Sequence, residues 1–296
     1  MKKQVKLFLD SGAYSALTQN AVIDIDQYIA FIKEHEDLIS IYANLDAIGD
    51  PEKTLANQKY MEAKGLSRLP CFHYGEDEKY LKHYLKNYKY MALGGMVPIA
   101  NSPLTVWLDR IFADFICDKS GMPTIKVHGF GLTSLPLLLR YPWYSVDSTS
   151  WVMTSRMGSI YVPKYKNGKW LYDENPLKII MSAKSPAKKE AGKHISTLAK
   201  AELDIINKYL QSKNYSIGRS DFKEESEKYT LKENERWAGK PINGKREVEI
   251  VVEPGLCNEY KLRDEVNIIF FMDLEKSIQQ WPWSFKCEST IKGFGI

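Results

Sequence analysis

The 296-residue chain lacks the features that mark secreted, membrane-spanning or zinc-stabilised proteins. Its four cysteines are far apart and form no C-x-x-C pair, so the sequence indicates neither a structural zinc site nor a disulfide framework. No apolar run reaches the ~18 residues of a membrane span. The basic start M-K-K-Q-V-K precedes too short an apolar stretch for a secretory signal. We therefore expect reduced thiols, a cytoplasmic location and no membrane partner.

The first 150 residues alternate between short apolar runs and helical patterns. The runs cover residues 5–9, 39–45, 69–72, 90–93, 125–127 and 144–146, and the expected helices cover 24–36, 51–65, 78–87 and 103–119. This alternation predicts right-handed crossovers and a parallel sheet. Because no glycine-rich dinucleotide turn follows the first strand, we expect a TIM-like (β/α)8 barrel, regular or irregular, rather than a doubly wound sheet.

The alternation weakens after Trp151. Asn167-Gly168 predicts a type I′ hairpin, and the other expected elements are a helix at 195–210, a helical or loose stretch at 222–240, and strands at 248–252 and 266–271. We expect three parts: a catalytic barrel core at 1–163, a basic insertion of hairpin and helix at 164–247, and C-terminal strands at 248–296. These last strands either complete the barrel or form a small appendage.

Charge is distributed unevenly along the chain. The net charge is only +4, but residues 164–246 hold 19 Lys and Arg against 11 Asp and Glu, an excess of eight positive charges. A basic segment beside a nearly neutral body suits a polyanionic partner. A solvated helix face with charged loops is the alternative explanation.

Polar residues and glycines follow all six expected strands, at the edge where a parallel barrel carries its active site. These are Asp10-Ser11-Gly12, Asn44-Leu45-Asp46, His73-Tyr74-Gly75, Gly94-Gly95-Met96, His128-Gly129-Phe130 and Asp147-Ser148-Thr149. Each alone has a plainer explanation, since an aspartate after a strand is commonly a turn or capping residue. Their recurrence over six successive strands predicts a catalytic site.

Three carboxylates at one edge suit glycosyl transfer. Asp10, Asp46 and Asp147 offer a nucleophile, a proton acceptor and an acceptor for a substrate N–H edge, which is the chemistry of retaining glycosyl transfer. The Gly94-Gly95 pair allows a substrate to approach backbone N–H groups. The side chains that could enclose a flat ring are Tyr14, Phe130 and Met96. The sequence therefore predicts exchange of a nucleobase.

The same segments resemble the tRNA-guanine transglycosylase superfamily and, within it, the DNA-acting 7-deazaguanine transglycosylases. D-S-G-A-Y-S from Asp10 is similar to the family's D-S-G-G-[FY]-Q motif, and G-G-M from Gly94 to its G-G-L. H-G-F-G from His128 resembles its M-G-V-G segment, and Asp147 in V-D-S-T-S-W matches the aspartate of its V-D-x-F-D stretch. Order and spacing agree over residues 5–165.

The resemblance implies a barrel enzyme with Asp147 as nucleophile, Asp10 as general acid or base and Asp46 as acceptor for the guanine edge. It also implies substrate contacts at Ser11, Tyr14, His73, Gly94, Gly95, Met96, His128, Gly129 and Phe130. Ala13, Ser15, His73 and His128 depart from the family's residue types. These departures concern the identity of the base rather than the reaction class.

The implied partners are a nucleic acid and a free 7-deazaguanine base as co-substrate, with no nucleotide cofactor and no metal. The C-x-C-x-x-C…H zinc motif of the tRNA enzymes is absent from the sequence, which favours DNA over tRNA. Candidates for nucleic-acid contacts are Lys164, Lys166, Lys169 and Trp170 on the expected hairpin. A hairpin that only closes the barrel is the alternative.

Two other functions compete with base exchange. A metal-dependent barrel hydrolase would use Asp10, His73, His128 and Asp147 as ligands, but no H-x-H or other close ligand pair occurs. A nucleic-acid-binding scaffold with a degenerate barrel would have no use for three aspartates at the strand ends, since buried carboxylates reduce stability.

Overall fold

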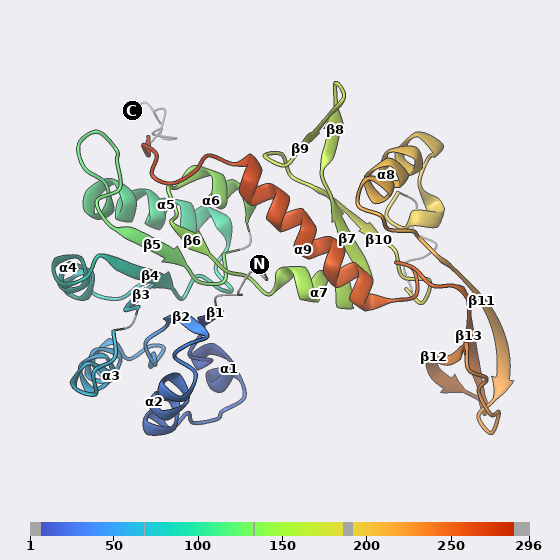
Figure 1. Cartoon of the computed structure of the whole chain (residues 1–296), viewed down its shortest axis with the longest axis horizontal. Coiled ribbons are helices and arrows are strands. Elements are labelled where there is room, and N and C mark those ends of the chain that lie inside the picture. The colour runs from blue at the N-terminus through green and yellow to red at the C-terminus, as the bar shows by residue number, and fades with distance from the viewer. Residues whose placement is uncertain (1–6, 68, 133, 186–191, 287–296) are drawn as a thin grey trace, which may run out of the picture. The chain divides into compact units, whose positions relative to one another are not determined.

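The computed structural model describes residues 7–67, 69–132, 134–185 and 192–286 (Figure 1). The chain divides into two compact units: unit 1 comprises residues 1–148 and 279–296, and unit 2 comprises residues 149–278. The expected basic insertion at 164–247 thus lies within unit 2, together with its flanking segments on both sides.

Unit 1 is an α/β unit in which helices alternate with parallel strands (Figure 1). The strands are β1 (Leu7–Leu9), β2 (Ile39–Tyr42), β3 (Cys71–His73), β4 (Tyr90–Gly94), β5 (Lys126–Gly129) and β6 (Ser145–Val146). The helices are α1 (Ala13–Thr18), α2 (Ile25–Glu34), α3 (Pro51–Ala63), α4 (Glu78–Asn87), α5 (Asn101–Ile111) with its π-helical extension η1 (Phe112–Ile116), and α6 (Leu135–Arg140). All six strands expected from the apolar runs are confirmed within the described residues.

The six strands follow one another in chain order. β1 pairs in parallel with β2, and β3 to β6 form a four-stranded parallel sheet. A parallel bridge between Ala43 and Leu69 joins the two sets. Because adjacent strands lie about 4.8 Å apart, a flat arrangement would separate β1 from β5 by about 19 Å. The Phe8 ring of β1 nevertheless stacks on the His128 ring of β5 at 4.5 Å between centroids, so the strand array is strongly curved.

Local signals explain where the helices begin. The carboxylates of Asp24, Asp50 and Asp77 accept backbone N–H bonds at the first turns of α2, α3 and α4. Such caps satisfy N–H groups that have no partner within the helix. Pro51 occupies the first turn of α3, where its missing N–H has no cost.

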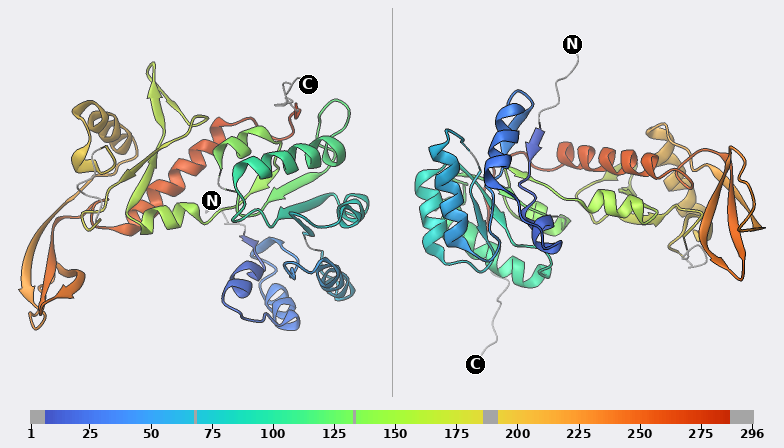
Figure 2. Two further views of the ribbon diagram at one scale, coloured as in Figure 1. Left: turned by 180° about the vertical axis from the view of Figure 1, so that it is seen from behind. Right: turned by 90° about the horizontal axis from the view of Figure 1, so that it is seen from below.

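The core of unit 1 lies between the sheet and its covering helices. Leu81 and Tyr84 of α4 and Leu108 of α5 pack with Met91 and Val127 of the strands, and all five are fully or almost fully buried. Figure 2 shows these helices along the same side of the strands. The helical periodicity of 78–87 and 103–119 therefore marked the faces that cover the sheet.

The segment after the helix α9 (Tyr260–Ser277) belongs again to unit 1. Phe285 is buried against Phe112 and Tyr141, and its N–H donates to the Gly121 carbonyl at 2.8 Å. A Cβ on Gly121 would lie 2.2 Å from the Phe285 carbonyl oxygen, and its φ is +82°. Only glycine suits this position, because both the backbone angle and the close approach exclude a side chain.

Unit 2 mixes helices with antiparallel strands (Figures 1 and 2). Its elements are α7 (Ser150–Arg156), β7 (Ser159–Val162), β8 (Lys164–Lys166), β9 (Lys169–Leu171), β10 (Leu177–Ile180), the 3-10 turn η3 (Ile195–Thr197), α8 (Lys200–Ser212), β11 (Arg219–Ser226), β12 (Glu235–Ile242), β13 (Lys245–Glu253) and α9 (Tyr260–Ser277). β7 pairs with β10, and β13 lies between β11 and β12. Asn267 ties α9 to α7 and β7 through the Trp151 carbonyl, the Ser159 carbonyl and the Tyr161 N–H.

Three sequence predictions for unit 2 are confirmed and two are corrected. The strand expected at 248–252 is part of β13. The β8–β9 hairpin turns at Asn167 and Gly168, both with positive φ, and a helix occupies most of 195–210 as α8. The strand expected at 266–271 is wrong, because these residues lie in α9 and bury Val266, Phe270 and Leu274 at helical spacing. The stretch at 222–240, expected to be helical or loose, contains β11 and β12, which cross-strand pairs such as Lys245–Glu224 at 2.8 Å stabilise.

Helix length and polarity also bear on membrane association. Within the described ranges, no helix combines the length and apolar character needed to traverse a bilayer.

Candidate active site

Asp10 directly follows β1 and is exposed. The Gly12 N–H approaches its Oδ1 at 3.4 Å, and the positive φ of Gly12 (73°) makes this turn possible. Although the residue is partly open to solvent, neighbouring atoms desolvate its carboxyl group, and this desolvation raises the pKa of Asp10 above its ordinary value despite the Gly12 N–H. The charges of Asp147 and Asp46 raise that pKa further. The carboxylates expected after β1, β2 and β6 are therefore electrostatically coupled, and Asp10 is suited to exchange protons.

Asp46, which follows β2, lies against His73, the last residue of β3. His73 Nε2 lies 3.4 Å from Asp46 Oδ2, and both side chains are more than nine-tenths buried. On the other ring nitrogen, Nδ1 lies 2.9 Å from Glu76 Oε1, and Glu76 Oε2 also accepts the His73 backbone N–H. The imidazole is thus fixed between two carboxylates.

The electrostatics of this group follow from burial and charge. Burial alone lowers the pKa of His73, but Cys71, Asp46 and Glu76 outweigh it and raise that pKa above its ordinary value. Burial raises the pKa of the Cys71 thiol to about 12. Asp46 Oδ1 is buried without a hydrogen-bond partner among the described residues. Such an acceptor costs about 1–3 kcal/mol, which a bound N–H donor would recover.

Asp147 and His128 form a second polar pair, after β6 and on β5. Asp147 Oδ1 accepts the Gly131 N–H at 2.8 Å and lies 3.5 Å from His128 Nε2. The side chain of Asp147 is 44% exposed, whereas that of His128 is 2% exposed. Both contacts involve Oδ1, so Oδ2 is the oxygen available to a substrate. Two further polar side chains orient the His128 ring through its other nitrogen. His128 Nδ1 lies 2.7 Å from Ser145 Oγ, and Ser145 Oγ lies 2.6 Å from the Tyr90 hydroxyl.

The glycines after β4 permit close packing beside His73. A Cβ on Gly94 would lie 2.8 Å from Cys71 Sγ and 2.9 Å from His73 Cδ2. Gly95 is exposed with φ of +67°, and a Cβ there would approach the Tyr74 nitrogen at 3.1 Å. The two positions thus leave backbone rather than side chains beside the Asp46–His73 pair.

The aromatic residues expected to enclose a ring lie in different surroundings. Phe130 contacts His128 edge-on at 4.6 Å and Phe8 at 6.0 Å. Tyr14 is 51% exposed on α1, whereas Met96 is 3% exposed within the core of unit 1. Tyr14 is therefore accessible to a ligand, Phe130 is partly buried beside His128, and Met96 is a packing residue in this structure.

The remaining predicted contacts are glycine and serine positions. Ser11 is buried, and its Oγ accepts the Ala13 N–H at 3.4 Å. Gly129 is buried at the end of β5, where a Cβ would lie 3.2 Å from the Trp143 ring. Gly129 therefore permits the close packing of Trp143 against the end of β5.

Three buried side chains could hold a metal ion. The ligand atoms of Asp46, Cys71 and His73 lie within 4.8 Å of one another. Tetrahedral zinc with bonds of about 2.0–2.3 Å places its ligand atoms about 3.3–3.6 Å apart, and the 3.4 Å between His73 and Asp46 fits this value. The Glu76 carboxylate contacts His73 Nδ1. In metal sites a carboxylate commonly binds the second ring nitrogen of a ligating histidine and so orients the ring. Of the four ligands expected for a metal hydrolase, only His73 belongs to this set.

The sequence did not reveal four supporting residues: Phe8, Cys71, Glu76 and Ser145. Glu76 is the one with a readable signal, because it follows His73 by three residues in the turn after β3. The others are strand residues whose partners come from other strands. Their roles depend on the pairing register.

The hairpin residues expected to contact nucleic acid have partners within unit 2. Lys164 and Lys166 pair with Glu174 at 3.2 and 2.8 Å. Trp170 packs against Tyr165 and Tyr209 beside the core of unit 2. Lys169 is exposed on β9. Of these four residues, Lys169 offers the most accessible positive charge.

Comparisons with known proteins identify no relative. No family model matches the chain, and neither a curated protein nor a solved structure matches it.

Proposed function

We propose that the protein is a guanine transglycosylase that replaces guanine in DNA with a 7-deazaguanine derivative through a covalent aspartyl-glycosyl intermediate. The observation that carries this proposal is the position of three carboxylates, Asp10, Asp46 and Asp147, directly after or close after the parallel strands β1, β2 and β6. The charges of Asp147 and Asp46 also contribute to the raised pKa of Asp10. Their environments differ: Asp147 is accessible, Asp10 has a raised pKa, and Asp46 is buried with a free acceptor oxygen. These different environments suit the different roles of nucleophile, proton carrier and hydrogen-bond acceptor.

We propose that unit 1 has the architecture of a TIM-like (β/α)8 barrel, regular or irregular. Six parallel strands in chain order, curved enough to bring Phe8 onto His128, support it. In such barrels the catalytic groups lie at the carboxyl ends of the strands, where Asp10, Asp46 and Asp147 are.

In the first half-reaction, Asp147 attacks C1′ of a guanosine that has left the base stack. The C1′–N9 bond breaks, its electron pair departs with guanine, and an ester forms between the Asp147 carboxylate and C1′. Protonated Asp10 gives its proton to N9 of the departing base. The Gly131 N–H holds the other carboxylate oxygen and so orients Asp147 for attack, and His128 Nε2 lies 3.5 Å from the same oxygen.

In the second half-reaction, a free 7-deazaguanine enters and Asp10 takes the proton from its N9. N9 then attacks C1′, and the ester bond to Asp147 breaks with its electron pair returning to the carboxylate. Asp46 accepts hydrogen bonds from the ring N–H and the exocyclic amine of both bases. His73, fixed by Glu76, holds Asp46 in place.

Trapping of the covalent intermediate tests this proposal. Wild-type protein incubated with a guanine-containing oligonucleotide, without an incoming base, should give a slow-migrating band on a denaturing gel. Asp147→Ala should give none, whereas Asp204→Ala, which removes an exposed carboxylate on α8, should behave as wild type. An adduct that survives Asp147→Ala would exclude Asp147 as the nucleophile.

The polymer is decided by exchange of labelled guanine into duplex DNA, single-stranded DNA and tRNA side by side. Incorporation into DNA is the expected result, and incorporation into tRNA alone would make the enzyme a tRNA-guanine transglycosylase. No exchange into any of the three would favour a nucleic-acid-binding scaffold.

A metal-dependent hydrolase is the second candidate, because Asp46, Cys71 and His73 form a ligand set. Metal analysis of the purified protein separates the two functions. Stoichiometric zinc or manganese that is lost in His73→Ala would favour the hydrolase. Guanine exchange that persists in the presence of a chelator would favour the transglycosylase.

A further inference from the structure

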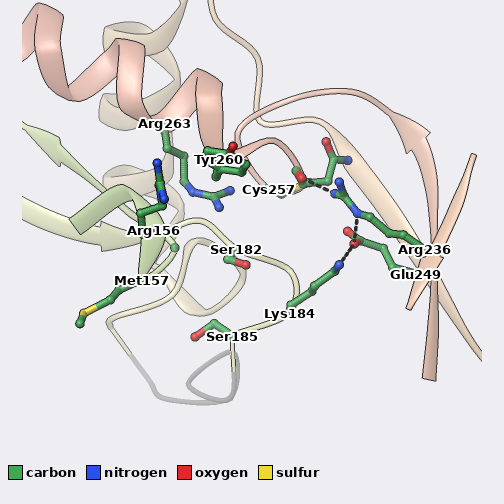
Figure 3. A pocket seen from close by; sticks show the side chains of 12 residues that line it. Arg156, Met157, Ser182, Lys184, Ser185, Arg236, Glu249, Cys257, Tyr260 and Arg263 are labelled. Carbon is green, nitrogen blue, oxygen red and sulfur yellow. Dashed lines mark hydrogen bonds and ion pairs between the residues drawn. The ribbon is translucent and has the colours of Figure 1, made fainter. Parts of the chain in front are cut away.

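A cavity of about 420 Å³ lies in unit 2, and none of the residues discussed above for catalysis or nucleic-acid binding lines it (Figure 3). Its walls come from α7, the segment after β10, β12, β13 and the start of α9. The charged residues among its lining are Arg156, Lys184, Arg236, Arg263 and Glu249. A cavity of this size can accommodate a small ligand or part of a larger one.

The lining has an excess of positive charge. Glu249 is fully buried and accepts from both Lys184, at 2.9 Å, and Arg236, at 2.7 Å. Although burial opposes it, these two cations lower the pKa of Glu249, so the residue is an anion. Glu259, outside the lining, pairs with Arg236 at 3.1 Å. The lining itself contains one carboxylate and four cationic side chains. The cavity walls therefore favour an anionic occupant.

Arg263 is the most deeply buried of the four cations that line the cavity, so its positive charge is poorly solvated. It is 5% exposed, and its guanidinium donates to the carbonyls of Ser155 at 3.0 Å and Leu256 at 2.5 Å. Within the described ranges, no carboxylate lies within ion-pair distance of it. Burial lowers the pKa of Arg263 and outweighs the charges of Asp264 and Glu259, which act on it from beyond ion-pair distance. A guanidinium has five N–H donors, and these two bonds use only part of them.

Arg156 lies beside Arg263 on the same wall of the cavity, whereas Lys184 and Arg236 approach from the opposite wall (Figure 3). The guanidinium of Arg156 lies 4.9 Å from the centroid of the Tyr260 ring, and among the described residues it has no ion-pair partner. Cations on two sides of one cavity are arranged to hold an anion between them.

We propose that this cavity binds a phosphate group. Two unpaired guanidinium groups match the planar, forked geometry by which arginine binds phosphate oxygens. The cavity is larger than a single phosphate, so it has room for the attached sugar. Phosphate in this form comes either as a free nucleotide or as the backbone of a nucleic-acid strand. The proposal does not depend on the reaction proposed for unit 1.

Binding measurements on the full chain test the proposal with three probes: inorganic phosphate, guanosine monophosphate and a fluorescent single-stranded DNA oligonucleotide. Calorimetry measures the first two, and fluorescence anisotropy measures the third at several salt concentrations. The test variants are Arg156→Gln and Lys184→Gln, which change exposed residues. The matched control is Lys276→Gln, a 70% exposed lysine at the end of α9, outside the cavity.

Each test variant should weaken binding of at least one probe about tenfold, the usual effect of losing one charge-assisted bond, while Lys276→Gln changes it little. Weaker binding of phosphate and the mononucleotide alone identifies a free phosphate ester as the ligand. Weaker binding of the oligonucleotide alone, with the salt slope reduced by about one, identifies backbone phosphate. Wild-type affinity of both folded variants for all three probes would overturn the proposal.

Discussion

Gly94→Ala should disturb the centre of the candidate active site through one added methyl group. Gly94 ends β4, beside Cys71 and His73 on β3. The new Cβ would lie 2.8 Å from Cys71 Sγ and 2.9 Å from His73 Cδ2, whereas ordinary contacts begin at 3.4 Å. Each neighbour must therefore move by about 0.5 Å. Both are at least 95% buried, so neither can turn into solvent.

The expected cost is about 1–3 kcal/mol in the free energy of unfolding, the usual range for overpacking a dense interior. The same movement changes the distance of 3.4 Å between His73 and Asp46. Because a reaction site tolerates displacements of only about 0.5 Å, guanine exchange should also fall, by about tenfold.

Urea denaturation and the labelled-guanine assay measure the two effects. Cys71→Ala removes the sulfur atom that lies nearest the new Cβ, so the double variant Gly94→Ala/Cys71→Ala should lose less stability than the two single variants together. The rescue should be partial, because the contact with His73 remains. An unchanged unfolding free energy in Gly94→Ala, or strictly additive losses in the double variant, would refute the tight packing of β3 against β4.

Two further predictions concern charge and packing. Glu76→Gln should lower the pKa of His73 in an NMR titration, because the Glu76 carboxylate helps to raise that pKa against the opposing effect of burial. A raised histidine pKa stabilises the fold fully below the unfolded value of about 6.5 and less as the pH rises toward the folded value. The difference in unfolding free energy between wild type and Glu76→Gln should thus be largest near pH 6 and shrink in alkaline solution, and a difference that grows with pH would contradict the argument. Trp170→Ala should lower the unfolding free energy by about 2–4 kcal/mol, because the ring packs on Tyr165 and Tyr209. Lys169→Gln, the control, should leave stability unchanged. Equal urea midpoints for Trp170→Ala and wild type would show that this ring is dispensable for the fold.

The course of the chain through unit 1 could be predicted because its signals are local. Apolar runs bounded by glycine, proline and capping aspartates marked the six strands and the four longer helices. The two six-residue helices α1 and α6 were not predicted from the sequence. Asp24, Asp50 and Asp77 cap the helices that follow them. Unit 2 was harder to read, because V-N-I-I-F-F at 266–271 is short and apolar and fits either a strand or a helix. The long helix that contains it became evident only from the burial of Val266, Phe270 and Leu274.

The sequence was enough to predict that acidic residues and glycines follow successive parallel strands, and hence that Asp10, Asp46 and Asp147 lie at one edge of the sheet. The tertiary structure alone decided which groups surround them. Glu76 fixes His73, Ser145 supports His128, and the Phe8 ring covers His128 because the strands curve. The cationic cavity of unit 2 is of the same kind, since its arginines come from α7, β12 and α9. Strand periodicity and helix caps act between neighbours in the chain, whereas burial and electrostatic coupling act between neighbours in space, and only folding makes those neighbours.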